Sequence, residues 1–160
     1  MFELREFMRR VPQCVTVVTT VANGKPHGMT VSSFTSVTLD PPTILIVLEK
    51  TTQTCKTVLT SHSFCVNLLS EKQSHVSDVF AYVPHEQRFE RINYHIESGK
   101  YPVIDGSIGA LFCDVKESFE MSTHQIILGT VKDVKIFSDE QPLIYLQRQY
   151  HRPVKVTETA

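Results

Sequence analysis

The stretch from residue 24 to residue 42 reads Gly-Lys-Pro-His-Gly-Met-Thr-Val-Ser-Ser-Phe-Thr-Ser-Val-Thr-Leu-Asp-Pro-Pro. It is typical of a strand between turn formers, but small hydroxyl residues stand where a strand built only for a core would carry Val, Ile or Leu. Small side chains let a large flat ligand approach the backbone, and hydroxyls and free amides offer it hydrogen bonds. These residues alone leave two readings open: a ligand-binding loop, or an ordinary serine-rich edge strand or turn.

The surrounding sequence predicts an antiparallel barrel. Asn23-Gly24 is a strong hairpin signal that places a strand at 15–21 against a return strand at 27–39, with a break at the serines. Further strands are predicted at 43–49, 63–69, 107–120 and 124–137, and a seventh apolar-alternating segment lies at 143–150. Six or seven strands with short turns and few helices indicate a mainly β protein closed as a barrel.

Helical spacing is confined to three short segments. Apolar residues at the start of the chain predict an amphipathic helix over 2–10 that Pro12 ends. A helix within 51–61 has Thr54 as its expected N-cap, and a helix over 70–80 has Ser70 in that place. Residues 81–102 follow no regular pattern and are expected to form an irregular excursion or a long loop.

The composition excludes several classes of protein. The chain has 160 residues, a hydrophobic fraction of 41% and a net charge of −1, with no internal repeat or linker. We therefore expect one domain over residues 1–152 with a polar tail at 153–160. The near-neutral charge gives no reason to expect a nucleic acid or membrane partner. The charged N-terminal segment lacks the apolar region of a signal peptide, so the expected location is the cytoplasm.

The usual catalytic and metal-binding motifs are absent. The chain has no Gly-x-Gly-x-x-Gly, no phosphate-binding Walker loop and no paired carboxylates, and its seven histidines show no spacing typical of a metal site. Its four cysteines form no Cys-x-x-Cys pair and are expected to be small buried hydrophobic residues. If the protein is an enzyme, a bound cofactor must supply its chemistry.

The ordered motifs of the chain resemble the flavin reductase-like, FMN-binding split-barrel family, whose members include reductase components of two-component flavin-dependent monooxygenases. The segments that carry the resemblance are 15–20, 26–42, 64–69, 124–131 and 142–145. The resemblance implies a split β-barrel of Greek-key type with two or three short helices, and a homodimer. It also implies that NADH or NADPH reduces FMN or FAD. One departure is Ser32, because many members of the family carry Asn at this position.

The resemblance also implies site residues. The residues expected to line the flavin ring are Thr30, Val31, Ser32 and Ser33, with Ser36 supporting the same loop. Lys50, Thr51 and Thr54 would bind a phosphate, whereas the residues alone indicate only a capped surface helix. His124 would serve nucleotide binding as the catalytic residue, although a histidine here could simply end a strand.

The remaining candidates have equally plain alternatives. Asn67 contacts the flavin or is a satisfied core amide, since a polar residue in an apolar strand needs a partner. Phe80 packs on the flavin or closes the core. Arg148 could pair with a pyrophosphate and Tyr150 could stack on a cofactor ring. Arg88 would cover the flavin from the irregular segment.

The sequence favours an NAD(P)H:flavin oxidoreductase that supplies reduced flavin to a separate monooxygenase. A flavoprotein that reduces another acceptor, such as ferric iron or cobalamin, would use the same barrel. A non-catalytic module that holds flavin or haem is the third reading. His124 and the hydroxyl-rich loop favour the enzyme, and the lack of a basic cluster for a 2′-phosphate favours NADH.

Overall fold

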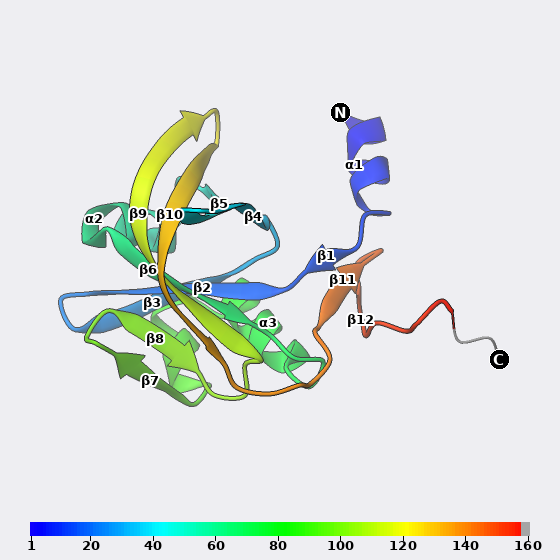
Figure 1. The fold of residues 1–160 in the computed structure, drawn as a ribbon. Helices are drawn as coiled ribbons and strands as arrows, with labels where there is room; N and C mark the ends of the chain where they lie inside the picture. Colours follow the sequence, from blue (N-terminus) through cyan, green and yellow to red (C-terminus); the bar gives the residue numbers. More distant parts are fainter. Residues whose placement is uncertain (158–160) are drawn as a thin grey trace.

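A seven-stranded antiparallel sheet forms the body of the protein, which the computed structural model describes over residues 1–157 (Figure 1). Its strands are β2 (Thr16–Ala22), β3 (Lys25–Val31), β4 (Phe34–Leu39), β5 (Pro42–Glu49), β6 (Ser63–Leu68), β9 (Gly109–Met121) and β10 (His124–Ile136). They are hydrogen-bonded in the order β3-β2-β6-β9-β10-β5-β4. The two end strands do not pair with each other, so the curled sheet stays open.

Two small sheets and four short helices complete the fold. The first small sheet contains β1 (Gln13–Cys14), β11 (Ile144–Leu146) and β12 (Gln149–His151), and the second pairs β7 (Tyr94–Glu97) with β8 (Tyr101–Ile104). The helices are α1 (Phe2–Met8), α2 (Gln53–Ser61), α3 (Ser74–Tyr82) and the 3₁₀ helix η1 (His85–Glu90). Figure 1 shows that α1 extends away from the barrel, as does the far end of the long β9–β10 hairpin.

The predicted break at the serines is confirmed, and it separates two strands that pair with different partners. Asn23 and Gly24 have positive φ angles of 52° and 74° and close the expected hairpin between β2 and β3. The return strand then stops at Val31, and Phe34 begins β4, which pairs with β5 rather than with β2. Ser32 and Ser33 therefore connect the two open ends of the sheet.

Three sequence predictions about local structure are wrong. Residues 81–102 are not irregular, because they contain η1, β7 and the start of β8. Thr54 is not the N-cap of α2, since the side chain of Thr52 accepts the hydrogen bond from the Cys55 amide. The third helix begins at Ser74 rather than Ser70, and its N-cap residue Gln73 makes no side-chain capping bond.

Three apolar clusters stabilise the fold, and the two larger ones pack the barrel and its covering helices. The barrel cluster includes Ile46, Leu48, Val58 and Phe64, all 1% exposed or less. The second cluster packs α3 against the sheet and contains Val17, Phe80, Ile104 and Leu143. Burial of this apolar area is the main stabilising term and fixes where the connecting loops lie.

The structure also bears on the cysteines, the tail and possible membrane spans. Cys55, Cys65 and Cys113 are buried as expected, Cys14 is half-buried, and all four are free. The predicted tail at 153–160 is described only to residue 157, and residues 158–160 lie outside the described part. Within residues 1–157 no helix is long and apolar enough to cross a membrane.

Candidate functional site

The hydroxyl-rich loop lies along β5. Ser33 accepts a hydrogen bond from the Val47 amide at 3.1 Å, and Ser32 accepts one from the Phe34 amide at 3.0 Å, both through their backbone carbonyls. The side chain of Ser32 is half-buried and that of Ser33 is exposed. Neither hydroxyl makes a hydrogen bond inside the part of the chain described here. They are therefore free to contact a ligand, whereas Val31 is buried in the barrel cluster.

The same barrel edge carries the ends of β5 and β10. The Lys50 amide donates to the Thr123 carbonyl at 3.0 Å, and His124 pairs with Glu49 in the β5–β10 register. His124 is exposed, and its Nδ1 lies 2.8 Å from the Thr123 hydroxyl. Lys50 forms an ion pair with Glu120 at 3.4 Å. The fold thus brings Ser33, Lys50 and His124, which are far apart in the sequence, to neighbouring strands.

The N-terminus of α2 follows directly and fits a phosphate group. Helix N-terminal amides favour anions, and Thr51 is exposed beside them. Thr54 lies in the first turn with its Oγ1 buried and without a hydrogen-bond partner within residues 1–157. An orphaned hydroxyl in this position, together with Lys50 and Thr51, matches the donor set that a phosphate needs.

A second group of candidates meets at α3. The Thr30 hydroxyl donates to the Ser77 carbonyl at 2.7 Å, and the Tyr150 hydroxyl bonds to Ser77 Oγ at 2.9 Å and to Asp78 Oδ1 at 2.6 Å. Burial, followed by the bond to Asp78, raises the pKa of Tyr150 to about 12. Tyr150 thus connects β12 to α3 through hydrogen bonds. These bonds explain the position of its ring without stacking on a cofactor.

Two predicted cofactor residues, Asn67 and Phe80, are buried and have contacts inside the fold. Asn67 is fully buried: its amide nitrogen donates to Val17 and Pro102 carbonyls and to the Thr19 hydroxyl, while its oxygen accepts from the Ile104 amide. The core-amide reading therefore explains the position of Asn67 without a contact to the flavin. Phe80 is likewise a core residue, 1% exposed.

Arg88, Arg148 and Ser36 lie away from the site just described. Arg88 donates to the carbonyls of Gly28 and Val83 and so holds η1 against β3. Arg148 lies in the β11–β12 turn and lines a groove of about 250 Å³ beside α1. Ser36 is exposed on β4. The structure does not bring Arg88, Arg148 or Ser36 together with His124.

A histidine pair that the sequence did not reveal lines a cavity of about 530 Å³. His27 Nδ1 and His85 Nε2 are 2.8 Å apart, and the rings stack with centroids at 5.1 Å. Burial lowers the pKa of both imidazoles, and Lys25 lowers that of His27 further. Gln53, at the start of α2, lines the same cavity. The two histidines are 58 positions apart, so no local motif could have indicated the pair.

Comparisons with known proteins identify the family of this chain. Residues 8–153 match the model of the flavin reductase like domain. The chain is 31% identical over 150 residues to an "FMN reductase (NADH) RutF" of Ancylobacter novellus, covering 93% of this chain and 83% of that protein. It is 32% identical over 149 residues to the reductase component of an FADH(2)-dependent resorcinol hydroxylase of a Rhizobium species, covering 91% and 83%.

Solved structures give the same result for the fold. The NADH:FAD oxidoreductase SgcE6 of Streptomyces globisporus, in complex with NAD and FAD fragments, superposes with a TM-score of 0.90 at 26% identity, covering 98% of this chain and 94% of that one. The flavin reductase HpaC in complex with NADP+ gives a TM-score of 0.87 at 29% identity, covering 96% and 98%. The expected mainly β split barrel is confirmed. The chain belongs to the flavin reductase-like domain family.

Proposed function

We infer that this protein is an NAD(P)H-dependent flavin reductase that passes hydride from NADH or NADPH to FMN or FAD. The observation that carries this inference is the barrel edge where free hydroxyls of Ser32 and Ser33, the N-terminus of α2 and His124 meet. Relatives named as NADH-dependent FMN reductases and flavin reductases support the same activity. When bound, the flavin accepts the hydride and carries the reducing equivalents onward.

The side chains at this edge bind and align rather than exchange protons. Hydride transfer needs the two cofactor rings stacked with the reacting atoms close together, so most of the rate enhancement comes from positioning. We propose that Ser32 and Ser33 hydrogen-bond the edge of the flavin ring, with Thr30 and Val31 shaping the strand that leads to them. Lys50, Thr51 and Thr54 would hold the phosphate, and His124 would contact the nicotinamide nucleotide.

Two further proposals concern the protein partners of this chain. We propose that it supplies reduced flavin to a separate oxygenase, as the relative named as a hydroxylase reductase component suggests. We also propose a homodimer, supported by exposed apolar side chains on α1 and on the β9–β10 hairpin. The free cysteines fit a reducing compartment such as the cytoplasm.

The activity is tested by following NADH oxidation by purified protein with FMN, FAD or riboflavin, with NADPH as comparison. Turnover that depends on added flavin supports the reductase. Oxidation that begins only with ferric or corrin acceptors would assign another acceptor. Flavin-loaded protein that oxidises no pyridine nucleotide would be a binding module and would overturn the inference.

The phosphate assignment needs its own test. A Thr51→Ala/Thr54→Ala variant should bind FMN about tenfold more weakly, because two donors to a charged group are lost. Riboflavin, which has no phosphate, should bind both proteins equally, so it is the matched control. FMN affinity equal to that of the unchanged protein would remove the phosphate assignment.

A further inference from the structure

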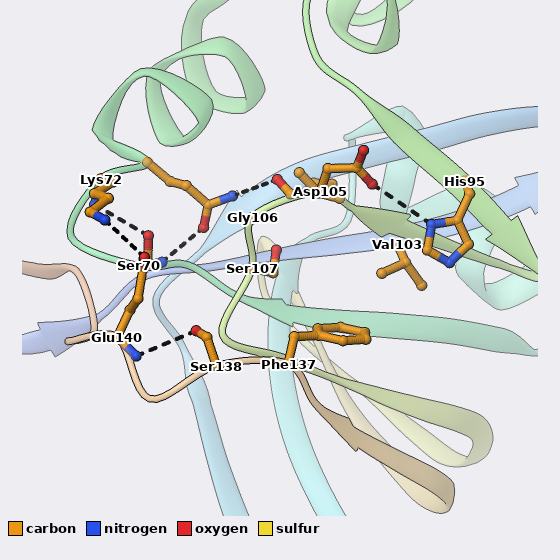
Figure 2. Close-up of a pocket in the computed structure, with 12 residues that line it drawn as sticks. Ser70, Lys72, His95, Val103, Asp105, Gly106, Ser107, Phe137, Ser138 and Glu140 are labelled. Carbon is orange, nitrogen blue, oxygen red and sulfur yellow. Dashed lines mark hydrogen bonds and ion pairs between the residues drawn. The ribbon is translucent and has the colours of Figure 1, made fainter.

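A cavity of about 450 Å³ lies outside the candidate flavin site (Figure 2). Its walls come from the loop between β6 and α3, the β7–β8 hairpin, the β8–β9 loop and the segment after β10. None of the residues proposed above to bind flavin or nucleotide lines it. Cavities of this size accommodate ring-sized ligands.

The floor of this cavity contains a polar atom that the fold leaves unsatisfied. Ser107 is 2% exposed, and its Oγ has no hydrogen-bond partner within residues 1–157. Figure 2 shows Ser107 between Gly106 and Phe137 with no contact drawn to it. A buried hydroxyl without a partner is unfavourable, so a ligand that bonds to it gains more than it would at the surface. Val103 and Ile104, both buried, supply apolar surface at the same level.

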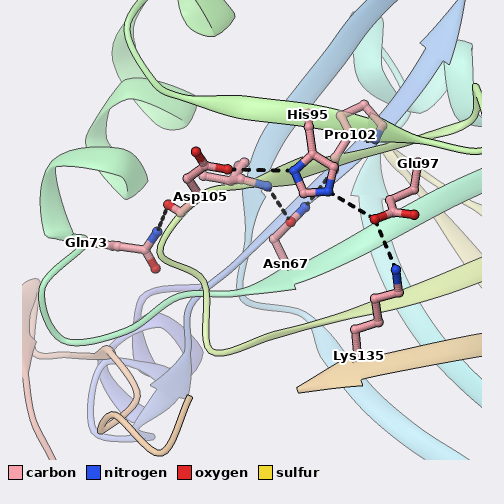
Figure 3. A network of polar contacts seen from close by, with 8 residues as sticks. Asn67, Gln73, His95, Glu97, Pro102, Asp105 and Lys135 are labelled. Carbon is pink, nitrogen blue, oxygen red and sulfur yellow. Dashed lines mark hydrogen bonds and ion pairs between the residues drawn. The ribbon is translucent and has the colours of Figure 1, made fainter. Parts of the chain in front are cut away.

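Hydrogen bonds fix the positions of the segments that form the cavity wall. Gln73 accepts from the Ser70 amide at 2.8 Å and donates to the Asp105 carbonyl at 3.1 Å, so it ties the β8–β9 loop to the start of α3. Asn67 accepts a hydrogen bond at 3.0 Å from the amide of Ile104, the last residue of β8 before this loop. Figure 2 draws the bond between Gln73 and Ser70, and Figure 3 draws those of Gln73 to Asp105 and of Asn67 to the β8 backbone. These contacts make the cavity pre-formed, which lowers the entropic cost of binding.

The Lys72 and Glu140 charges at the mouth are paired with each other, and the Glu97 and Asp105 carboxylates lie beside His95. Lys72 bonds to Glu140 at 2.9 Å, and His95 lies 3.1 Å from Glu97 and 3.7 Å from Asp105. The hydrogen bond from the Lys72 ammonium lowers the pKa of Glu140, which favours the charged form of this carboxyl. A ligand with a net charge would have to break one of these pairs or approach a like charge, so the electrostatics favour a neutral molecule.

Phe137 adds an aromatic wall. Its side chain is 49% exposed and lines the cavity opposite the β8–β9 loop, as Figure 2 shows. An aromatic ring with a free face prefers another ring in an offset or edge-on arrangement. A complementary ligand therefore has an aromatic ring to pack on Phe137 and a polar group to bond to Ser107.

We propose that this cavity binds a neutral single-ring aromatic molecule whose polar substituent hydrogen-bonds to Ser107 while its ring packs on Phe137. The proposal does not rest on the flavin reductase activity, since no residue is shared with that site. Phenol is the simplest probe of this class. Benzoate and benzylammonium have similar size and carry opposite charges, so they test the claim that the ligand is neutral.

The test is a titration of the flavin-free protein with each probe, followed by ligand-observed NMR and calorimetry. Phenol should bind saturably and at least tenfold more tightly than either charged probe. Ser107→Ala should weaken phenol binding about five- to tenfold, the effect of one hydrogen bond. Phe137→Ala should weaken it by a similar factor, and Ser118→Ala, on the exposed face of β9, should leave it unchanged.

Stability separates a binding role from a structural one. Because the Ser107 hydroxyl has no partner in the described fold, Ser107→Ala should unfold at the same or a higher temperature than the unchanged protein. Phenol binding that survives both Ser107→Ala and Phe137→Ala, absence of saturable phenol binding, or tighter binding of benzoate or benzylammonium would each overturn the proposal.

Discussion

At the scale of single residues, polar side chains in apolar surroundings separate into two kinds. Asn67 has every hydrogen-bonding atom satisfied inside the chain, whereas Thr54 and Ser107 each carry a buried hydroxyl without a partner among residues 1–157. The first kind stabilises the fold, because removing one partner leaves another group unsatisfied. The second kind costs stability in the fold and points to ligands.

Asn67→Ala should destabilise the protein by about 2–3 kcal/mol, because it leaves the Ile104 amide unsatisfied in the core. Urea denaturation measures this change. Asn93→Ala, at an exposed asparagine, should change stability by less than about 0.5 kcal/mol. An Asn67→Ala protein of normal stability but weak flavin binding would restore Asn67 as a cofactor residue.

His124→Ala should lower kcat/KM for NADH about tenfold, the effect of losing one specific contact to the nucleotide. Steady-state kinetics at saturating flavin measure the change, and the flavin dissociation constant should stay the same. His62→Asn replaces another exposed histidine, in the left-handed position after α2 that Asn tolerates, and serves as control. Unchanged NADH kinetics in His124→Ala would refute its role.

At the scale of elements, short polar contacts fix how the covering segments sit on the barrel. The 3₁₀ helix η1 is attached to β3 by Arg88, which bonds to the Gly28 carbonyl at 2.8 Å, and by the His27–His85 pair. At Gly28 an added Cβ would come within 3.0 Å of the Phe80 ring. A larger residue at this position would therefore press on the Phe80 ring of α3, and glycine lets β3 and α3 approach closely.

The histidine pair makes the η1 attachment sensitive to pH. Burial lowers the pKa of both imidazoles, so the folded state binds fewer protons than the unfolded chain, whose histidines titrate near 6.5. The groups that face the pair are Lys25 and Arg88, which disfavour protonation, and Glu86, which favours it. The pair's contribution to stability is therefore fully present above pH ~6.5 and declines as the pH falls through and below that value.

Lowering the pH from about 7.5 to about 5.5 should thus reduce the urea midpoint of the unchanged protein, and less so that of His85→Gln. His75→Gln, at an exposed histidine on α3, is the control and should keep the full pH dependence. Equal pH dependence in His85→Gln and the unchanged protein would show that the pair does not carry the effect.

At the scale of the whole molecule, apolar side chains remain exposed on two projecting elements. A second copy of the chain could bury them in a dimer interface. Helix α1 has no buried residue, with Phe2 70% and Phe7 66% exposed, and Figure 1 shows it standing apart from the barrel. Met121 near the end of the β9–β10 hairpin is 65% exposed. Apolar surface on projecting elements is typical of interfaces.

If α1 forms the proposed dimer contact, Phe2→Asp/Phe7→Asp should make the protein monomeric, because charges would be buried in that contact. Light scattering during gel filtration measures the mass. Val154→Asp/Val156→Asp changes two apolar residues that are even more exposed than Phe2 and Phe7, and it should leave the mass unchanged. A monomeric unchanged protein, or a dimeric Phe2→Asp/Phe7→Asp variant, would contradict the proposed interface.

The sequence determined the elements whose signals are local. The Asn23-Gly24 hairpin, the apolar strand β5 and the break at Ser32 and Ser33 follow from turn chemistry and side-chain pattern, and the ordered motifs identified the family. Residues 81–102 carry no such pattern, because β7 and β8 pair through backbone hydrogen bonds. The burial of β8 comes from its contacts with β2 and β6, which are distant in the sequence.

Only the tertiary structure decided which polar residues are available to a ligand. Asn67 and Arg88 looked like Thr54 in the sequence, since each is a polar side chain near a predicted site. Their partners, such as the Pro102 carbonyl for Asn67 and the Gly28 carbonyl for Arg88, are 35 and 60 positions away. Whether a buried donor is satisfied depends on such distant partners, and the chain reveals them only when it is folded.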